Sequence, residues 1–417
     1  MGTILWTGNG QAQVQIDSIN VASIATGALL TVTINGKSIS YSVVAADTTV
    51  TAATNLFALL SNNALTPPEF QEMTWSNPTP GTILATANTA GTPFAFTTST
   101  TLGAVLTHGF VQPNSSQNDV LNPNNYSPAR LPTAFDDFVI ANSSNSLLWN
   151  LNQFPLVNSL TRWQSFTGTI GLPVINAGGY YEYRPTYLTI GGGASSSSGG
   201  PGILKVTLGV GQTGSGPSRE RYNFLGQATN LVVLKSGSAQ DAYSVVAIGS
   251  NAQNTLNALG TSIGSAMIPG ETAAWGTINV NGGGSIALGA GASVTSLTLQ
   301  NAAGEIYDVP GTISMNQGST LIVGSTGLVY PSITAVGGSN ISWISDSNIT
   351  NLIMTTSSVF DASVDVRKFT IASITMDGDT CIVRDPNNRI IPLSVTVNNM
   401  VKSGPFIFGT NRTVKVS

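Results

Sequence analysis

Charged side chains are unusually scarce in this sequence. Asp, Glu, Lys and Arg together make up 8% of its 417 residues, whereas ordinary soluble domains carry about 25%. Between Asp308 and Asp346 no charged residue occurs at all. Disorder is nevertheless excluded, because 41% of the residues are hydrophobic and the formal net charge is only -4, and disordered chains show the opposite composition.

A nucleic-acid partner is also excluded by the charge. The 15 Lys and Arg residues are outnumbered by 19 Asp and Glu and are well scattered, whereas a nucleic-acid binder needs a basic patch. The missing charge is replaced by Gly, Ser, Thr and Asn among recurring Val, Ile and Leu, which is typical of exposed β-structure. Viral structural proteins, bacterial adhesins and S-layer proteins have surfaces of this kind.

Cysteine and histidine occur once each. Cys381 alone permits no intrachain disulfide and no thiolate metal cluster, and His108 has no partner at a metal-binding spacing. Long apolar runs and an N-terminal signal sequence are missing too, so we expect neither a membrane span nor Sec export. A virion protein made in the host cytoplasm and released by lysis fits this combination, whereas a secreted adhesin would need a leader.

Residues 1–107 are expected to form a small N-terminal α+β module. Two alternating runs meet at Asn35-Gly36, which predicts a hairpin because both turn positions favour positive φ. The next segment changes to helical periodicity, with Thr48 or Thr49 as its cap and an apolar stripe of Ala52, Leu56, Leu59 and Leu60. Three further strands follow, so the predicted order is β-β-β-α-β-β-β.

Residues 108–135 are rich in Pro, Asn and Ser, and they are expected to form a linker or an extended arm. From residue 136 to 417 short apolar-alternating strands start roughly every twenty residues, which indicates a solenoid. We predict an irregular right-handed parallel β-helix, so the fold class is mainly β.

Residues 252–267 are considered as a short helix, although Gly260 and Gly264 weaken that interpretation. A solenoid needs covered ends, so the module or arm should cover one end and the last strand, 409–417, the other.

No set of residues with catalytic, cofactor-binding or metal-binding spacing is found. The pair Asp136-Asp137 is better interpreted as the entry to a strand than as two glycosidase carboxylates. Residues 375–389 contain Asp377, Asp379 and Asp385 but lack the complete calcium-loop pattern. The glycine-rich stretch 188–202 does not match a phosphate-binding loop. We therefore expect a protein that is not an enzyme and has no cofactor.

The densest aromatic cluster is "GGYYEYRPTYLTIGGG", residues 178–193. In an extended strand Tyr181 and Tyr183 share one face, and Glu182 and Arg184 the other. Rings on one side and a charge pair on the other favour packing between coils or subunits, with a glycan-binding surface as the alternative. The candidate interface or packing residues are Tyr180, Tyr181, Glu182, Tyr183, Arg184, Tyr187 and Trp163.

The segment "FTGTIGLPVINAGGYYEYRPTYLTIGGG" resembles a family of β-rich virion-like structural proteins of phages and prophages. In that family a phrase of the form "TGxIGLPxxNxxGYYEYRPxYLxIG" precedes a C-terminal β-helix. The stretches "PGETAAWGTINV" and "SSVFDASVDVRKFTIASITMDGDTCIVRDPNN" fit the same family, and "ALLTVTINGKSISYSV" with "PPEFQEMTW" is similar to a small domain of phage-like gene clusters. The resemblance implies a structural role in the virion, in the head or the tail, and carries over no catalytic motif.

The leading hypothesis is therefore a phage virion structural protein, most simply a capsid decoration or cement protein. Its expected partners are the major capsid protein or other virion proteins and further copies of itself, for example as a trimer. Nucleic acid and membrane are not expected as partners, and the expected location is the virion, assembled in the host cytoplasm. Two alternatives stay open: a tail or receptor-binding protein that binds glycans, and a cell-surface S-layer or adhesin subunit.

Overall fold

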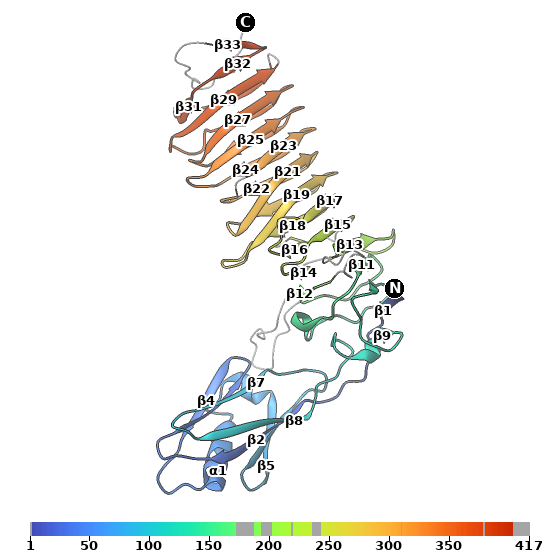
Figure 1. Ribbon diagram of the computed structural model, residues 1–417, viewed down its shortest axis with the longest axis vertical. Coiled ribbons are helices and arrows are strands. Elements are labelled where there is room, and N and C mark those ends of the chain that lie inside the picture. Colours follow the sequence, from blue (N-terminus) through green and yellow to red (C-terminus); the bar gives the residue numbers. More distant parts are fainter. Residues whose placement is uncertain are drawn as a thin grey trace.

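The computed structural model describes residues 2–171, 187–192, 202–217, 220–235, 243–309, 311–377 and 380–402. It is mainly β, with a parallel β-solenoid of about 10 turns, here called coils, and a small N-terminal β module before it. Figure 1 shows an elongated molecule with the module at one end and the solenoid rising from it toward the C-terminus. The predicted fold class is confirmed.

The solenoid is built from two sheets of mostly parallel strands, and most coils contribute one strand to each sheet. The first sheet contains β1 (Gly2–Trp6), β9 (Tyr126–Ser127), β10 (Asp136–Ile140), β11 (Ser159–Trp163), β13 (Leu204–Val210), β15 (Thr229–Val233), β17 (Thr255–Leu259), β19 (Ala273–Asn281), β21 (Ala292–Gln300), β23 (Thr312–Asn316), β25 (Val329–Ala335), β27 (Asn348–Thr355), β29 (Phe369–Asp377), β31 (Ile390–Pro392), β32 (Val395–Val397) and β33 (Met400–Lys402).

The second sheet contains β12 (Leu188–Thr189), β14 (Glu220–Asn223), β16 (Val245–Ile248), β18 (Ser262–Ser265), β20 (Ser285–Leu288), β22 (Ala303–Ile306), β24 (Thr320–Val323), β26 (Asn340–Trp343), β28 (Val359–Asp361) and β30 (Ile382–Arg384). Residues 252–267, considered as a short helix, instead form β17 and β18. Gly260 has a φ of 57° between these two strands, a backbone conformation that suits a corner and not a helix.

The solenoid core is a set of aligned apolar columns. Parallel pairing in register places equivalent inward residues of successive coils on top of one another, so that each coil buries the apolar face of its neighbour. One such column runs through the whole first sheet: Ile4, Phe138, Leu160, Val206, Leu231, Leu256, Ile278, Leu297, Ile313, Ile333, Leu352, Ile374 and Val395.

The module is inserted into the solenoid after its first strand. β1 pairs in parallel with β10, and Ile4 and Trp6 belong to the solenoid core. The domain boundaries predicted from the sequence are therefore corrected: residues 2–6 are not part of the module, and its last strand, β8 (Val105–Gln112), extends past residue 107. The pairing of β1 with β10 could not be predicted from the sequence, because the two strands are about 130 residues apart and no local pattern encodes such a pairing.

The module folds as two antiparallel sheets with a helix packed on them. Its strands run in the orders β5-β6-β2-β8 and β4-β3-β7. The elements not yet given are β2 (Ile16–Ser23), β3 (Leu29–Ile34), β4 (Lys37–Ser42), α1 (Thr49–Leu60), α2 (Pro68–Gln71), β5 (Met73–Thr79), β6 (Thr82–Ala87) and β7 (Phe96–Thr100). The predicted order β-β-β-α-β-β-β matches β2 to β7 except for the short helix α2, and β8 continues from the predicted module into the segment that was expected to be a linker.

The turn and the helix cap predicted for the module are confirmed. Asn35 and Gly36 have φ angles of 46° and 84° in the β3–β4 turn. Thr48 caps α1 by accepting a hydrogen bond from the Thr51 backbone N–H. Of the predicted stripe, Ala52, Leu56 and Leu60 are buried, whereas Leu59 is 36% exposed.

The segment after β8 covers the first coil. It contains the short 3-10 helix η1 (Pro123–Asn125), and a second one, η2 (Leu151–Gln153), follows β10. Val120 and Tyr126 join the solenoid core, and the Tyr126 hydroxyl donates to the Val120 carbonyl at 2.6 Å. The expectation that the arm covers one end of the solenoid is confirmed, whereas residues 409–417 lie outside the described residues.

Candidate functional site

The outer face of the second sheet carries a groove of about 520 Å³ that crosses the strands from β20 to β30. Its position follows from the alternation of the strands, because every second residue of the second sheet points away from the core. The groove is lined by Tyr243, Ser285, Ile286, Ala303, Gly304, Glu305, Thr320, Leu321, Ile322, Asn340, Ile341, Ser342, Val359, Asp361 and Arg384.

The outward residues form two parallel columns along the solenoid axis. One column runs through Ser285, Ala303, Thr320, Asn340 and Val359, which are partners in register from β20 to β28. The other runs through Ala287, Glu305, Ile322, Ser342, Asp361 and Arg384. The groove floor is therefore a regular array of hydroxyl, amide and aliphatic groups, one from each column per strand.

Charge is confined to two places in the groove. At one of them Arg384 donates to Asp361 at 3.3 Å. Burial raises the pKa of Asp361, but hydrogen bonds from Ser363 and Arg384 outweigh it and hold the pKa below its ordinary value. At the other, Glu305 accepts a hydrogen bond from the Tyr307 hydroxyl, and this bond with burial raises the pKa of Tyr307 to about 12.

Two tyrosine rings pack directly on glycines, one within β18 and one directly after β24. A Cβ at Gly264 would meet the Tyr243 ring at 2.7 Å, and a Cβ at Gly324 would meet the Tyr307 ring at 2.7 Å. Glycine at these two positions is what lets each ring lie against the sheet. Tyr243 lines the groove, and Tyr307 is 40% exposed beside it.

The carboxylates of this face are not arranged for glycoside cleavage. Glu305 and Asp361 are three strands apart in one column, which is about 14 Å at a strand spacing of about 4.8 Å, whereas glycosidase pairs are about 5–10 Å apart. Asp136 and Asp137 point to opposite faces of β10: Asp136 is buried against Arg130, and Asp137 accepts from Asn158 and Ser159. The groove is thus suited to binding through many weak contacts.

The predicted aromatic site is only partly described. Tyr180, Tyr181, Glu182, Tyr183 and Arg184 lie outside the described residues. Trp163 ends β11 in the first sheet, is 40% exposed, and lies against Gly211.

Tyr187 directly precedes β12 in the second sheet. Its hydroxyl donates to Glu271, the Arg221 guanidinium lies 5.7 Å from its ring centre, and burial followed by the bond to Glu271 raises its pKa. Trp163 therefore lies in the first sheet, whereas Tyr187 lies next to a strand of the second.

His108 is a structural residue of the module and not part of a linker. It lies on β8, with a ring nitrogen 2.6 Å from the buried Asp17 carboxylate. Its ring is 4.7 Å from those of both Phe96 and Phe110. Gln15 donates to the second oxygen of Asp17 at 2.6 Å.

The aspartates considered for calcium do not converge on a site. Asp385 is buried and accepts the backbone N–H groups of Arg389 and Ile390, both at 2.8 Å. Asp377 is exposed at the end of β29, and Asp379 lies outside the described residues. Within the described ranges no group of three or more His, Cys, Asp or Glu residues is placed to hold a metal ion.

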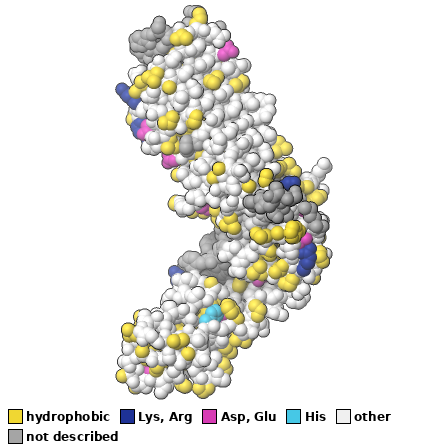
Figure 2. All heavy atoms as spheres, in the orientation of Figure 1, with side chains coloured by type: hydrophobic (Ala, Val, Ile, Leu, Met, Phe, Trp, Pro, Cys, Tyr) yellow, Lys and Arg dark blue, Asp and Glu magenta, His cyan; other side chains and the backbone are white. Residues whose placement is uncertain are grey.

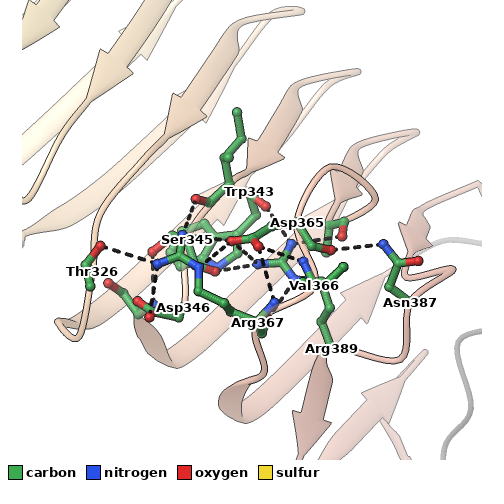
Figure 3. A network of polar contacts seen from close by, with 12 residues as sticks. Thr326, Trp343, Ser345, Asp346, Asp365, Val366, Arg367, Asn387 and Arg389 are labelled. Atoms are coloured by element: carbon green, nitrogen blue, oxygen red, sulfur yellow. Dashed lines mark hydrogen bonds and ion pairs between the residues drawn. The ribbon is translucent and has the colours of Figure 1, made fainter.

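A polar cluster that sequence reasoning missed lies at the corner after β28, next to the Asp361 end of the groove (Figure 3). The Arg389 guanidinium is fully buried and donates to four backbone carbonyls, those of Trp343, Ser345, Ala362 and Arg367, at 2.6 to 2.9 Å. These acceptors belong to two coils and Arg389 to the next, so one side chain ties three coils together. Burial lowers the pKa of Arg389.

Arg367 forms the outer layer of the same corner. It donates to Asp365 at 2.8 Å and to Asp346 at 3.1 Å. The hydrogen bond from Arg367 lowers the pKa of Asp365 to about 2. At this corner charged side chains bind backbone carbonyls and one another.

No protein-family model matches this chain, and no curated protein matches it significantly. Among the described residues, no helix is both long and apolar enough to cross a membrane.

Proposed function

We propose that this chain is a non-catalytic structural protein of a phage particle, displayed on the particle surface as a decoration or cement protein. The observation that carries the proposal is the insertion of the module between β1 and β10. Two chain connections join the module to the base of the solenoid, so a load on the solenoid is shared by two covalent links. Such an arrangement suits a protein that is held at one end and projects from the other.

The surface of the solenoid supports the same proposal. Figure 2 shows one face of it, which is mostly uncharged and carries Lys, Arg, Asp and Glu side chains in a few small groups. Uncharged polar surfaces are cheaper to desolvate than charged ones. A shell that repeats one modest contact by symmetry gains stability from many such surfaces. The expected partners are the major capsid protein or other virion proteins, and further copies of this chain, for instance in a trimer.

Quantitative mass spectrometry of gradient-purified particles tests the role. A decoration protein is expected at a copy number comparable with that of the major shell protein, and a trimer should be visible by native mass spectrometry of the isolated chain. Absence from the particle contradicts the proposal. A few copies per particle would move the role to the tail.

A matched pair of tags tests the orientation. One short epitope is inserted at Asn35-Gly36 in the module and the same epitope between Gly337 and Gly338 in the solenoid. Gly36 and Gly338 both have positive φ and open space around the Cβ position, so both turns should accept the insertion. Antibody should label the solenoid tag on intact particles and not the module tag, whereas the reverse pattern would show that the solenoid faces the shell.

A further inference from the structure

We propose that the groove on the outer face of the second sheet binds a linear, uncharged oligosaccharide that lies along the solenoid axis from β20 to β30. This site goes beyond the structural role proposed above and does not depend on it. It is distinct from the aromatic cluster at residues 178–193, and it is assigned from the register of the second sheet.

The length and repeat of the groove match an extended glycan. Six strands from β20 to β30 line it, and with strands about 4.8 Å apart the groove is about 24 Å long. The strand repeat is close to the length of one pyranose unit in an extended chain, so successive sugars meet equivalent positions of successive coils. The volume of about 520 Å³ lies within the range of ligand sites, roughly 300–1,000 Å³.

The groove offers hydrogen-bonding groups that are free to bind. Ser285, Thr320 and Ser342 point outward, and their hydroxyl groups have no side-chain hydrogen bond to any described residue. Asn340 lies in the same column as Thr320 and is exposed, but its amide nitrogen already donates to the Gly338 carbonyl at 3.2 Å, so its amide oxygen is the group it offers to a ligand. Each hydroxyl both donates and accepts, and an amide carries both functions on separate atoms, which is the pattern that sugar hydroxyl groups require.

Apolar surface lies between these polar groups. Ile322 is 39% exposed near the middle of the groove, and the Tyr243 ring lies on Gly264 near the β20 side. A pyranose ring has an apolar C–H face, which packs on aromatic and aliphatic surfaces because the face of an aromatic ring is negatively polarised. Alternating polar and apolar positions along one line therefore favour a sugar chain over a purely apolar ligand.

The charge of the groove selects against anionic polymers. Its charged residues are Glu305, Asp361 and Arg384, and the one cation among them is already paired with Asp361. Two carboxylates against one guanidinium leave a negative balance, so phosphate-bearing or uronate-bearing chains are repelled. Nucleic acids and acidic glycans are thereby disfavoured, and a neutral glycan is the ligand class that remains.

Isothermal titration of the full chain with defined oligosaccharides tests the proposal. The neutral probes are cellohexaose, maltohexaose and N-acetylchitohexaose, and the charged probes are hexagalacturonate and a thymidine hexanucleotide. At least one neutral probe should bind, and both charged probes should bind more weakly or not at all. Ile322→Arg should weaken binding of that neutral probe about tenfold or more, because a long cation then fills the middle of the groove.

A matched variant separates groove binding from a general effect on the fold. Val329→Arg introduces the same side chain at an exposed position of β25 in the first sheet, where the wild-type residue is 55% exposed, and it should leave the affinity unchanged. If Ile322→Arg does not fold, the double variant Thr320→Ala and Asn340→Ala replaces it, with the same expected loss. The proposal is overturned if no neutral probe binds, if the charged probes bind best, or if Val329→Arg and the groove variants have the same effect.

Discussion

The module and the solenoid are both β-rich, yet they complete their cores in different ways. In the module, antiparallel strands and α1 enclose one apolar cluster. In the solenoid each coil exposes an apolar face that only the next coil covers, so stability is a sum of neighbour contacts. A destabilising substitution should therefore lower the stability of the whole module, whereas in the solenoid it should lower only the stability of the neighbouring coils.

The largest expected effect is that of Trp343→Ala in the solenoid. Trp343 is fully buried, and its ring lies 5.3 Å from Tyr330 and 5.7 Å from Phe360 and Phe369. Truncation should cost about 3–5 kcal/mol. Hydrogen exchange with mass spectrometry should show lost protection in β25 to β29 only. Trp163→Ala, at a 40% exposed position, is the mild control, and lost protection in the module would contradict the local behaviour.

Leu56→Ala makes the corresponding cavity in the module. Leu56 is fully buried on α1, and its loss should cost about 3 kcal/mol. Here every element of the module should lose protection, while β13 and the strands after it keep theirs. Leu59→Ala, on the same helix but 36% exposed, should have little effect. Protection lost around α1 alone would show that the module is not a single cooperative unit.

Substitutions in two exposed turns, one in each region, should destabilise the module and the solenoid equally. Gly36 in the module and Gly318 in the solenoid have φ angles of 84° and 74°, and nothing lies within 4 Å of either Cβ position. Alanine at each should cost about 1 kcal/mol, because only the left-handed backbone is strained. Thermal unfolding of the two variants should therefore show equal free-energy losses. Clearly unequal losses would mean that the turns depend on their tertiary surroundings.

Lowering the pH should produce the smallest loss of stability, in the module and in the solenoid alike. The pKa of Asp365 is lowered to about 2, first by the Arg367 hydrogen bond, and that of Asp47 is lowered, first by the Tyr41 hydrogen bond. A carboxyl whose folded pKa lies below its unfolded value of about 3.9 stabilises the fold above that pH and ceases to do so as the pH falls. For Asp365 the loss should occur between about pH 4 and pH 2, and it should be small because Arg367 is 44% exposed.

Replacing each aspartate with asparagine measures how much its carboxylate contributes to the free energy of unfolding. The stability difference between wild type and Asp365→Asn should be constant above about pH 4 and shrink toward pH 2. Asp47→Asn should give a curve of the same sign in the module. A difference that grows as the pH falls would contradict the assigned direction of either pKa shift.

Local features of the fold were predictable because they depend on neighbours in sequence. The Asn35-Gly36 turn and the Thr48 cap need only a few residues to be recognised. The spacing of strand starts likewise predicted a solenoid. The sequence of segment 252–267 was compatible with either a helix or strands. In the structure it forms two strands with Gly260 at the corner between them.

The candidate groove was not predictable in the same way. Glu305 is 17 residues before Ile322, and Ile322 is 39 residues before Asp361; the three fall in one column only because of the register of β22, β24, β26 and β28. Corner lengths vary from coil to coil, so no fixed sequence period brings these residues together. Arg389 was missed for a related reason, since its partners are backbone carbonyls and not side chains.

Sequence by itself determined the mainly β class, the module with its helix and hairpin, and the stacked character of the C-terminal region, because alternation and turn chemistry act over a few residues. Only the tertiary structure decided that β1 belongs to the solenoid, that His108 pairs with Asp17, and that the second sheet carries a polar groove. The physical reason is that parallel pairing joins strands through long connections, and the register of those strands is set by how whole coils pack.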